Sequence, residues 1–339
     1  MGLPQQLHEL LAEGSEINIV CHNNPDPDCL ASALALGRIA ADAGIDDRQI
    51  FYSGDISHQQ NRAFVNLLDI DLQRFDPATV QNRQPDSLLA FVDHSTPGEN
   101  NTVPPDTDVD IVIDHHPAEE IDARFVDHRE ELGAAATILT EYLRALDMDL
   151  DADVATALLF AIRSDTLDFL RGATGAEYDA AGYLHEYADK ELIRKLSTSS
   201  LSRGTLDAIS TAIDNRTIKS AVLITHVGRT SERDALPQAV DYLVRLEGVQ
   251  TAIVFGIVND TIQISARSRD ARVDVGGVLN TAFEDVGSGG GHYDVAGGEI
   301  PLGIFADYTS DDARLLEMIE QIITARLLSE LNLSEDKEE

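Results

Sequence analysis

The chain has 339 residues, 43% of them hydrophobic, and a formal net charge of −35, because 60 acidic side chains outnumber 25 lysines and arginines. Such a chain is long enough for two domains with separate cores, and no apolar run in it approaches the roughly 20 residues of a membrane span. The acidic balance excludes the broad basic surface with which proteins bind long nucleic acid duplexes.

The first half of the chain predicts helices that alternate with strands. We expect helices at residues 5–13, 30–43 and 59–68, and strands at 17–21 and 49–53, before two apolar runs that end at Asp93 and Asp114. Helices follow at 134–145 and 153–163, and the second is apolar nearly all round, which is typical of a buried helix. This alternation predicts a parallel, doubly wound α/β sheet.

The second half predicts a helical stretch and then a smaller α/β unit. Helical patterns cover 175–188, 189–196 and 202–214, and the serine-rich segment 197–200 is the best hinge candidate. A strand at 220–226, a helix at 234–246, a hairpin of 252–258 and 261–266, a helix at 275–283 and a strand at 295–300 follow. We therefore expect a domain at 1–196, a linker or connecting helix at 197–216, a second domain at 217–330 and an acidic, frayed tail at 331–339, with a cleft between the domains.

Composition also bears on where the protein works. Lysine occurs only at Lys190, Lys195, Lys219 and Lys337. An acidic, lysine-poor surface is typical of salt-rich cytoplasms, where screening over about 3 Å at 1 M salt removes most self-repulsion. An acidic mimic of nucleic acid is the alternative. Because the N-terminus has no signal-peptide pattern and two cysteines do not make a disulfide framework, we expect a cytoplasmic protein.

Acidic and histidine-bearing motifs follow the apolar runs of the first domain. His22, Asp26 and Asp28 lie directly after the run 17–21, and Pro25 and Pro27 stiffen the segment between them. Polar side chains at the carboxyl ends of buried parallel strands meet at the ligand-binding edge of an open α/β sheet. A turn rich in Asn, Asp and Pro, with no ligand, is the alternative interpretation.

Three more motifs make the same edge acidic. Asp93 and Asp114 each close an apolar run, His115 and His116 follow Asp114, and Asp165 ends a helical pattern. Taken singly, His115 is equally a buried core histidine and Asp165 a helix cap. Taken together, so many carboxylates would repel one another strongly unless cations lay between them. The sequence therefore predicts a binuclear metal site, in which Asp114 orients His115 and His116 faces the substrate.

The second domain carries a glycine run, Gly289, Gly290 and Gly291, followed by His292. Glycines let backbone amides approach an anion closely, and the guanidinium of Arg267 matches phosphate oxygens in a bidentate manner. A surface loop without a ligand is the alternative.

Three segments near these motifs are harder to interpret. Ligation by the Cys29 thiol is not expected, because the set of oxygen and nitrogen ligands is already complete. The segment 57–62, which includes His58 and Arg62, either contacts substrate or only caps a helix. The segment 127–130 is interpreted as a solvated loop.

The combined motifs His22-x-x-x-Asp26-x-Asp28, Asp93, Asp114-His115-His116 and Asp165 resemble those of the DHH phosphoesterase superfamily. That group includes RecJ-type exonucleases, nanoRNase/pAp phosphatases, cyclic-di-AMP phosphodiesterases and family II inorganic pyrophosphatases. The glycine run, with segments 265–268 and 274–277, is similar to the first type of DHH-associated C-terminal domain. The resemblance spans most of the chain. Together with the acidic composition of the chain, it implies a haloarchaeal source.

The resemblance implies a pair of manganese ions. One ion would be held by His22 and Asp26. The other would be held by Asp28, His115 and Asp165, with Asp93 bridging both. The substrate phosphate would contact His116, so that His116 and Asp93 serve catalysis directly. The nucleotide would be bound by residues of the second domain, namely Arg267, Gly289, Gly290, Gly291 and His292.

Two divalent cations about 3.5–4 Å apart can acidify a water and clamp an in-line phosphoryl displacement, so no side-chain nucleophile is needed. We expect a hydrolase that acts on short oligoribonucleotides, pAp or di-adenylates, so that such a nucleotide is its partner. We expect it to bind neither a membrane nor a long duplex. The sequence leaves open whether the protein is a homodimer. A RecJ-like single-strand exonuclease is the runner-up, although the chain offers few aromatic stacking platforms. A pyrophosphatase fits the glycine run less well. A catalytically silent scaffold is the alternative from another class, and the complete ligand set argues against it.

Overall fold

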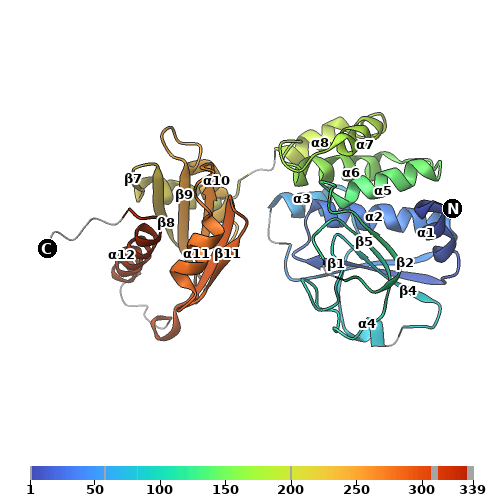
Figure 1. The fold of residues 1–339 in the computed structure, drawn as a ribbon, viewed down its shortest axis with the longest axis horizontal. Coiled ribbons are helices and arrows are strands. Elements are labelled where there is room, and N and C mark those ends of the chain that lie inside the picture. Colours follow the sequence, from blue (N-terminus) through green and yellow to red (C-terminus); the bar gives the residue numbers. More distant parts are fainter. Residues whose placement is uncertain are drawn as a thin grey trace. The chain divides into compact units, whose positions relative to one another are not determined.

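The computed structural model describes residues 2–56, 59–81, 83–118, 120–198, 201–306 and 312–333. The chain divides into a first unit, Met1–Ser200, and a second unit, Leu201–Glu339, drawn as ribbons in Figure 1. His58, half of the predicted hinge and most of the predicted tail lie outside the described residues. Within the described residues, no helix combines the length and the apolar character needed to cross a membrane.

The described part of the first unit contains a parallel sheet of six strands. They are β1 (Glu16–Asn23), β2 (Asp47–Ser53), β3 (Gln73–Arg74), β4 (Ser87–Val92), β5 (Val109–Asp114) and β6 (Ala123–His128). Their order across the sheet is β3-β2-β1-β4-β5-β6, so the winding reverses between β1 and β4. The predicted doubly wound sheet is confirmed, and the reversal favours a ligand site beyond the carboxyl ends of β1 and β4.

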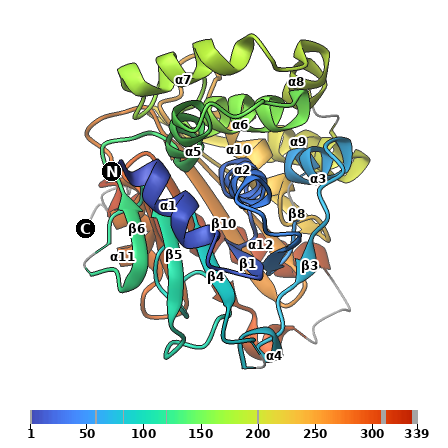
Figure 2. The same cartoon turned by 90° about the vertical axis from the view of Figure 1, so that its right-hand side faces the viewer.

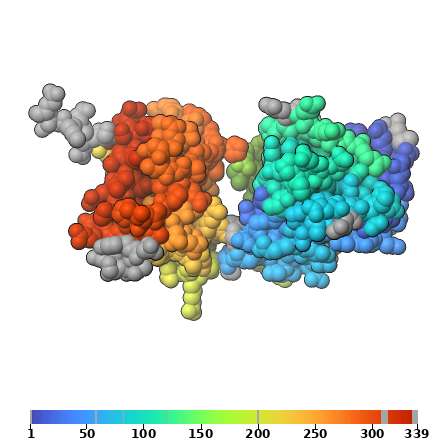
Figure 3. Space-filling view, turned by 90° about the horizontal axis from the view of Figure 1, so that it is seen from below, coloured from blue at the N-terminus to red at the C-terminus, as the bar shows by residue number. Residues whose placement is uncertain are grey.

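Helices cover one face of this sheet. The first unit contains α1 (Leu3–Leu11), α2 (Pro27–Asp42), α3 (Gln59–Leu67), α4 (Ala78–Gln81), α5 (Ala135–Ala145), α6 (Ala152–Asp165), α7 (Gly175–His185) and α8 (Lys190–Ser197). Apolar side chains of α2, α5 and α6 share one core with β1, β4 and β5, and Figures 1 and 2 show α7 and α8 outside that layer. The opposite face buries Phe91 and Val112 beneath Phe75 and Val80. Figure 1 shows α4 on this side of the sheet, and in Figure 3, seen from below, this part of the first unit is coloured cyan to green.

Strand β6 was not predicted, and the interpretation of residues 127–130 as a solvated loop is wrong. Asp127, on β6, is 3% exposed. It accepts a hydrogen bond from the hydroxyl of Tyr142 at 2.6 Å and two from the guanidinium of Arg129 at 2.8 and 2.7 Å. The segment looks polar in the sequence because it is rich in charged residues. It can be partly buried because these charges neutralise one another inside the fold.

The second unit is built on a mixed sheet. Its elements are α9 (Arg203–Asp214), β7 (Thr217–Lys219), β8 (Val222–Thr230), α10 (Ala235–Leu243), β9 (Thr251–Val258), β10 (Thr261–Ser268), α11 (Val275–Phe283), β11 (Ser288–Gly291), β12 (Val295–Pro301), η1 (Gly303–Phe305) and α12 (Asp312–Glu330). The strand order is β11-β12-β10-β9-β8-β7, in which β8 and β9 are parallel and the other pairs antiparallel. Neither β7 nor α12 was predicted.

Two separate hydrophobic cores lie on the two faces of this second sheet. Side chains of α9 and α10, including Ile209 and Leu236, pack on one face, and those of α11 and α12, including Phe283 and Ile319, pack on the other. Helix α9 agrees with the helix predicted at 202–214 and falls in the segment that the sequence predicted as a linker or connecting helix. Its apolar stripe of Ala208, Ile209 and Ala212 is buried in the second unit.

Candidate metal centre

The end of β1 and the start of α2 supply the first three predicted ligands. Asp26 caps α2: its carboxylate accepts hydrogen bonds from the backbone N–H groups of Asp28 at 2.9 Å and Cys29 at 3.1 Å. Pro27 follows as the first helical residue, where no N–H is needed. Nδ1 of His22 lies 2.9 Å from the carbonyl oxygen of Asn23, which leaves Nε2 to face Asp26 at 3.8 Å and Asp93 at 3.4 Å.

Asp93 occupies the position directly after β4 and is 2% exposed. Its backbone has a φ of 64°, in the left-handed region that costs a non-glycine residue about 1–2 kcal/mol. Its N–H donates to the carbonyl oxygen of Ile113 on β5 at 2.9 Å. The chain thus leaves the sheet abruptly at Asp93, a kind of strain that proteins retain at functional sites.

The Asp114-His115-His116 segment follows β5, and its two rings have different supports. Asp114 Oδ1 accepts hydrogen bonds from the backbone N–H groups of His115 at 2.7 Å and His116 at 3.0 Å, and also from Nδ1 of His116 at 3.0 Å. The ring of His115 instead places Nδ1 3.0 Å from the carbonyl oxygen of Leu132. The prediction that Asp114 orients the ring of His115 is therefore wrong, because it orients the ring of His116.

The six predicted metal ligands converge around Asp93. From Nε2 of His115 the distances are 3.2 Å to Asp93 Oδ1, 3.6 Å to Asp28 Oδ2 and 3.5 Å to Asp165 Oδ2. Asp165 is the last residue of α6. His22 lies close to the other oxygen of Asp93 and to Asp26. In the described part of the chain, three groups of side chains are close enough to hold a metal ion: His22, Cys29 and Asp93; Asp93, His115 and His116; and Asp28, His115 and Asp165. Asp26 adjoins the first group through His22.

Unpartnered atoms show that the site suits a cation. Asp93 Oδ1, Asp114 Oδ2 and His115 Nε2 are buried and have no hydrogen-bond partner among the described residues. Burying a polar atom without a partner is costly, and native proteins rarely do so without a ligand or water. Carboxylate oxygens and imidazole nitrogens are donors that suit a divalent ion such as Mn²⁺.

The charges of the cluster lead to the same conclusion. Burial opposes protonation of His22, yet the carboxylates of Asp26 and Asp93 raise the pKa of this histidine to about 12. Burial and the charges of Asp26 and Asp93 raise the pKa of Asp165 to about 6. Burial and neighbouring carboxylates also raise the pKa of Asp28. His22 therefore carries a proton in the ion-free protein that a bound cation would displace, and the two carboxylates hold their protons to a higher pH than usual.

Two further side chains adjoin the cluster without joining the predicted ligand set. The Cys29 Sγ donates to the carbonyl oxygen of Val92 at 3.3 Å, and burial raises the pKa of this thiol. This Sγ also lies within 4.8 Å of ligand atoms of His22 and Asp93, in a group of side chains that could hold a metal ion. His94 stacks on Phe91 with ring centroids 4.5 Å apart. Burial lowers the pKa of His94 to about 4, so its ring is neutral.

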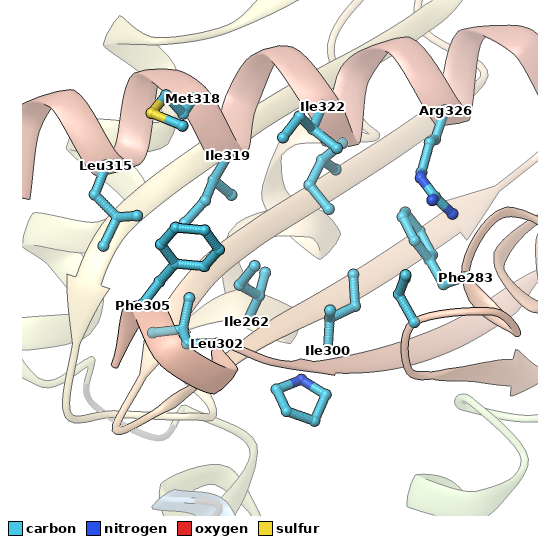
Figure 4. Close-up of a pocket in the computed structure, with 13 residues that line it drawn as sticks. Ile262, Phe283, Ile300, Leu302, Phe305, Leu315, Met318, Ile319, Ile322 and Arg326 are labelled. Carbon is cyan, nitrogen blue, oxygen red and sulfur yellow. The ribbon is translucent and has the colours of Figure 1, made fainter. Parts of the chain in front are cut away.

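A polar pocket of about 390 Å³ opens onto these groups and is lined by His22, Asp26, Asp93, His94, Asp114 and His116, among others. A larger pocket of about 430 Å³ lies in the second unit between α12 and β12, where Figure 4 shows mainly apolar side chains such as Ile300, Phe305 and Ile322. Its charged residue, Arg326, is paired with Asp285. That pocket lacks acid–base groups, whereas the polar pocket is lined by the converging predicted ligands and is therefore the candidate site.

The predicted substrate-binding residues of the second unit meet along β12. Arg267 on β10 pairs in register with Val295 of β12, and the backbone N–H of His292 donates to the carbonyl oxygen of Val295 at 2.8 Å. Gly289, Gly290 and Gly291 belong to β11, which pairs with the other side of β12. His292 is exposed, whereas the Arg267 guanidinium donates to Asp241 at 2.7 Å.

Sequence reasoning missed the groups that hold the ligands in place. The carbonyl of Leu132 orients His115, and the N–H groups of Ala135 and Ala136 donate to Asp28 at 2.7 and 2.9 Å. These are backbone groups on apolar or small residues. No residue type in the sequence signals them.

Comparisons with known proteins match both units. The family description "DHH family, N-terminal domain" matches residues 16–162, and "DHHA1 domain" matches residues 219–325. The uncharacterized protein MJ1633 of Methanocaldococcus jannaschii is 39% identical over 320 residues, which are 94% of this chain and 65% of that protein. The cyclic-di-AMP phosphodiesterase PdeA of Listeria monocytogenes is 26% identical over 345 residues, covering 95% of this chain and 49% of that enzyme. This chain thus spans about half to two thirds of these relatives.

Among solved structures, an exopolyphosphatase-related protein from Bacteroides fragilis matches with a TM-score of 0.73 at 15% identity. The match covers 97% of each chain. At that level of identity the likeness concerns the fold alone.

Proposed function

This chain belongs to the DHH family, with a DHHA1 domain, and we propose that it is a metal-dependent phosphoesterase that hydrolyses short nucleotides. The observation that carries the proposal is the convergence on Asp93 of His22, Asp26, Asp28, His115 and Asp165, which come from separate elements of the first unit. The unpartnered Asp93 Oδ1 and His115 Nε2 support it, because a purely structural cluster would satisfy these atoms internally.

One set of ligands would be His22 and Asp26, and the other Asp28, His115 and Asp165, with Asp93 between them. Two divalent ions held there would supply Lewis acidity and a water of lowered pKa. We propose Mn²⁺, because the donors are oxygen and nitrogen atoms.

His116 is the side chain best placed to contact the substrate. Its Nδ1 is bound by Asp114, so Nε2 is the nitrogen left for a phosphate oxygen. The hydrogen bond to Asp114 raises the pKa of His116, which favours the charged, donating form. The side chain is 55% exposed and lines the polar pocket, so a phosphate can reach it. A positioned donor of this kind stabilises charge that develops on the phosphoryl oxygens.

The extent of the alignments supports a proposal for the substrate class. The cyclic-di-AMP phosphodiesterase aligns with 95% of this chain, so both units have counterparts in an enzyme named for a dinucleotide substrate. We therefore propose di-adenylates and other short oligonucleotides as substrates. In this proposal Arg267, His292 and the backbone of Gly289, Gly290 and Gly291 bind the nucleotide. Replacing Arg267 with Ala would then raise KM and leave Mn²⁺ binding in the first unit unchanged.

The test is a substrate panel. The protein is stripped with a chelator, reloaded with Mn²⁺ in high salt, and incubated with ribonucleotides of two to five residues, pAp, cyclic and linear di-AMP, pyrophosphate and single-stranded DNA. Hydrolysis of the short nucleotides is expected, and Asp93→Ala should abolish it. Preferential degradation of long single-stranded DNA would favour the RecJ-like exonuclease. Wild-type protein that is as inactive as Asp93→Ala on every substrate would favour a silent scaffold.

A further inference from the structure

The metal ligands Asp28 and His115 share a support in the turn before α5. Leu132 supplies the carbonyl that fixes His115 Nδ1 at 3.0 Å. Ala135 and Ala136, three and four residues later, supply the N–H groups that bind Asp28. The N-cap of α5, Ala134, has no side chain that could cap the helix itself. The segment 132–136 therefore sets the positions of ligands from two other elements.

Gly133 brings this turn close to a third ligand. A Cβ atom at Gly133 would lie 2.8 Å from Cγ2 of Thr166 and 3.0 Å from the carbonyl oxygen of Gly172. Thr166 directly follows the ligand Asp165, and its hydroxyl donates to the carbonyl oxygen of Ile162 at 2.6 Å within α6. The turn therefore packs directly against the end of α6, where Asp165 is attached.

One buried carboxylate anchors the turn. Oε1 of Glu177 accepts a hydrogen bond from the N–H of Gly133 at 3.0 Å. Oε2 accepts from the N–H of Thr174 at 2.6 Å and from its hydroxyl at 2.7 Å. The bond to the N–H is one half of the capping box of α7, in which the Thr174 side chain accepts from the backbone of Glu177. Glu177 has no solvent-exposed surface. A capping box needs no buried contact with a second segment of the chain. Helix capping therefore does not explain why the Glu177 carboxylate also accepts a hydrogen bond from Gly133.

We propose that Glu177 is a positioning residue that sets the affinity of the metal centre. By holding Gly133 it holds the carbonyl of Leu132 on His115 and the amides of Ala135 and Ala136 on Asp28. Among the described residues, the hydrogen bonds of the Glu177 carboxylate go to Gly133 and Thr174 and to no predicted ligand. The inference rests on the metal centre of the proposed function, and it adds a determinant of that centre contributed by α7.

The test measures Mn²⁺ dissociation constants of metal-free protein by calorimetric titration, together with the melting temperature without metal. Glu177→Ala should weaken binding about 10- to 100-fold, the usual effect of removing a group that supports metal ligands. Thr174→Ala is the matched control, because it removes the capping hydroxyl of α7 but leaves the carboxylate on Gly133. It should lower the melting temperature and leave the Mn²⁺ affinity as in wild type.

A second variant keeps the test decisive if Glu177→Ala does not fold. Glu177→Asp retains the charge, but its shorter side chain cannot reach Thr174 and Gly133 together, so binding should again weaken. Wild-type affinity in a folded Glu177 variant would overturn the inference. So would an equal loss in Thr174→Ala, because the effect would then come from the stability of α7. Failure of the wild type to bind Mn²⁺ would instead count against the proposed function itself.

Discussion

Asp93 Oδ1 lies 3.2 Å from Nε2 of His115, and neither atom has a hydrogen-bond partner among the described residues. The two residues follow adjacent parallel strands, β4 and β5, so the sheet itself sets this approach. A carboxylate oxygen and an imidazole nitrogen that face each other without a bond leave a natural place for a cation.

The first prediction concerns Asp93. Because it faces both ligand sets, Asp93→Ala should lose Mn²⁺ binding and reduce hydrolysis by at least about 10²–10³-fold, the scale for losing one major electrostatic group at an active site. The measurements are metal stoichiometry and kcat on the best substrate of the panel.

The control for Asp93→Ala is Asp110→Ala. Asp110 is also a buried carboxylate, and it accepts hydrogen bonds from the N–H of Leu89 and from Arg83, each at 2.9 Å, near the other end of β5. Its loss should lower stability and spare the metal stoichiometry. Equal metal loss in both variants would mean that the site is merely sensitive to sheet stability.

Asp28 and Asp165 should behave differently in metal-free protein although both are predicted ligands. Asp28→Ala removes the acceptor for the first amides of α5, which should lower the free energy of unfolding by about 1–2 kcal/mol. The carboxylate of Asp165 accepts no hydrogen bond found in the described part of the chain, so Asp165→Ala should not destabilise the metal-free protein. The free energies of unfolding of the two variants, measured by urea unfolding in excess chelator, would show this difference. A comparable loss in both variants would contradict the assignment.

The raised pKa of Asp165 should make the stability of the metal-free protein depend on pH. Its folded-state pKa is raised to about 6, above the unfolded value near 3.9. The folded state therefore takes up the proton first, and wild-type stability should increase as the pH falls through 6. Relative to Asp165→Asn, metal-free wild type should be less stable at pH 7 and should draw level as the pH approaches 4. Chelated samples unfolded at several pH values would test this, and a difference that grows on acidification would refute it.

Gly133 should tolerate no side chain. A methyl group there would meet Thr166 and the Gly172 carbonyl, so Gly133→Ala should displace the turn, lower the melting temperature and weaken Mn²⁺ binding. Gly182→Ala is the control: it lies within α7, where an added Cβ has nothing within 4 Å. That substitution should raise stability by about 0.5–1 kcal/mol and leave metal binding unchanged.

Salt should stabilise the protein as a whole. With a net charge of −35, repulsion between carboxylates opposes compaction at low ionic strength, and screening relieves it. The melting temperature should rise steadily with potassium chloride up to molar concentrations, and more than with sucrose at equal osmolality. No rise beyond that seen with sucrose would argue against the halophilic character that we infer from composition.

Most of the fold could be predicted from the sequence, because hydrophobic periodicity reflects which faces are buried. The long apolar helices and the strands before Asp93 and Asp114 are examples. Strand β6 was missed because it carries charged residues whose charge is neutralised only in the fold, as that of Asp127 is by Arg129 just after the strand.

The sequence by itself determined which side chains make up the candidate metal site. His22, Asp93 and His115 were identifiable because carboxylates and imidazoles after buried parallel strands must meet at one edge of the sheet. Only the tertiary structure decided what holds them. His115 is oriented by the carbonyl of Leu132, and the loop around Gly133 is held by Glu177. These contacts use backbone groups, which every residue carries, so their partners could be found only once the chain had folded.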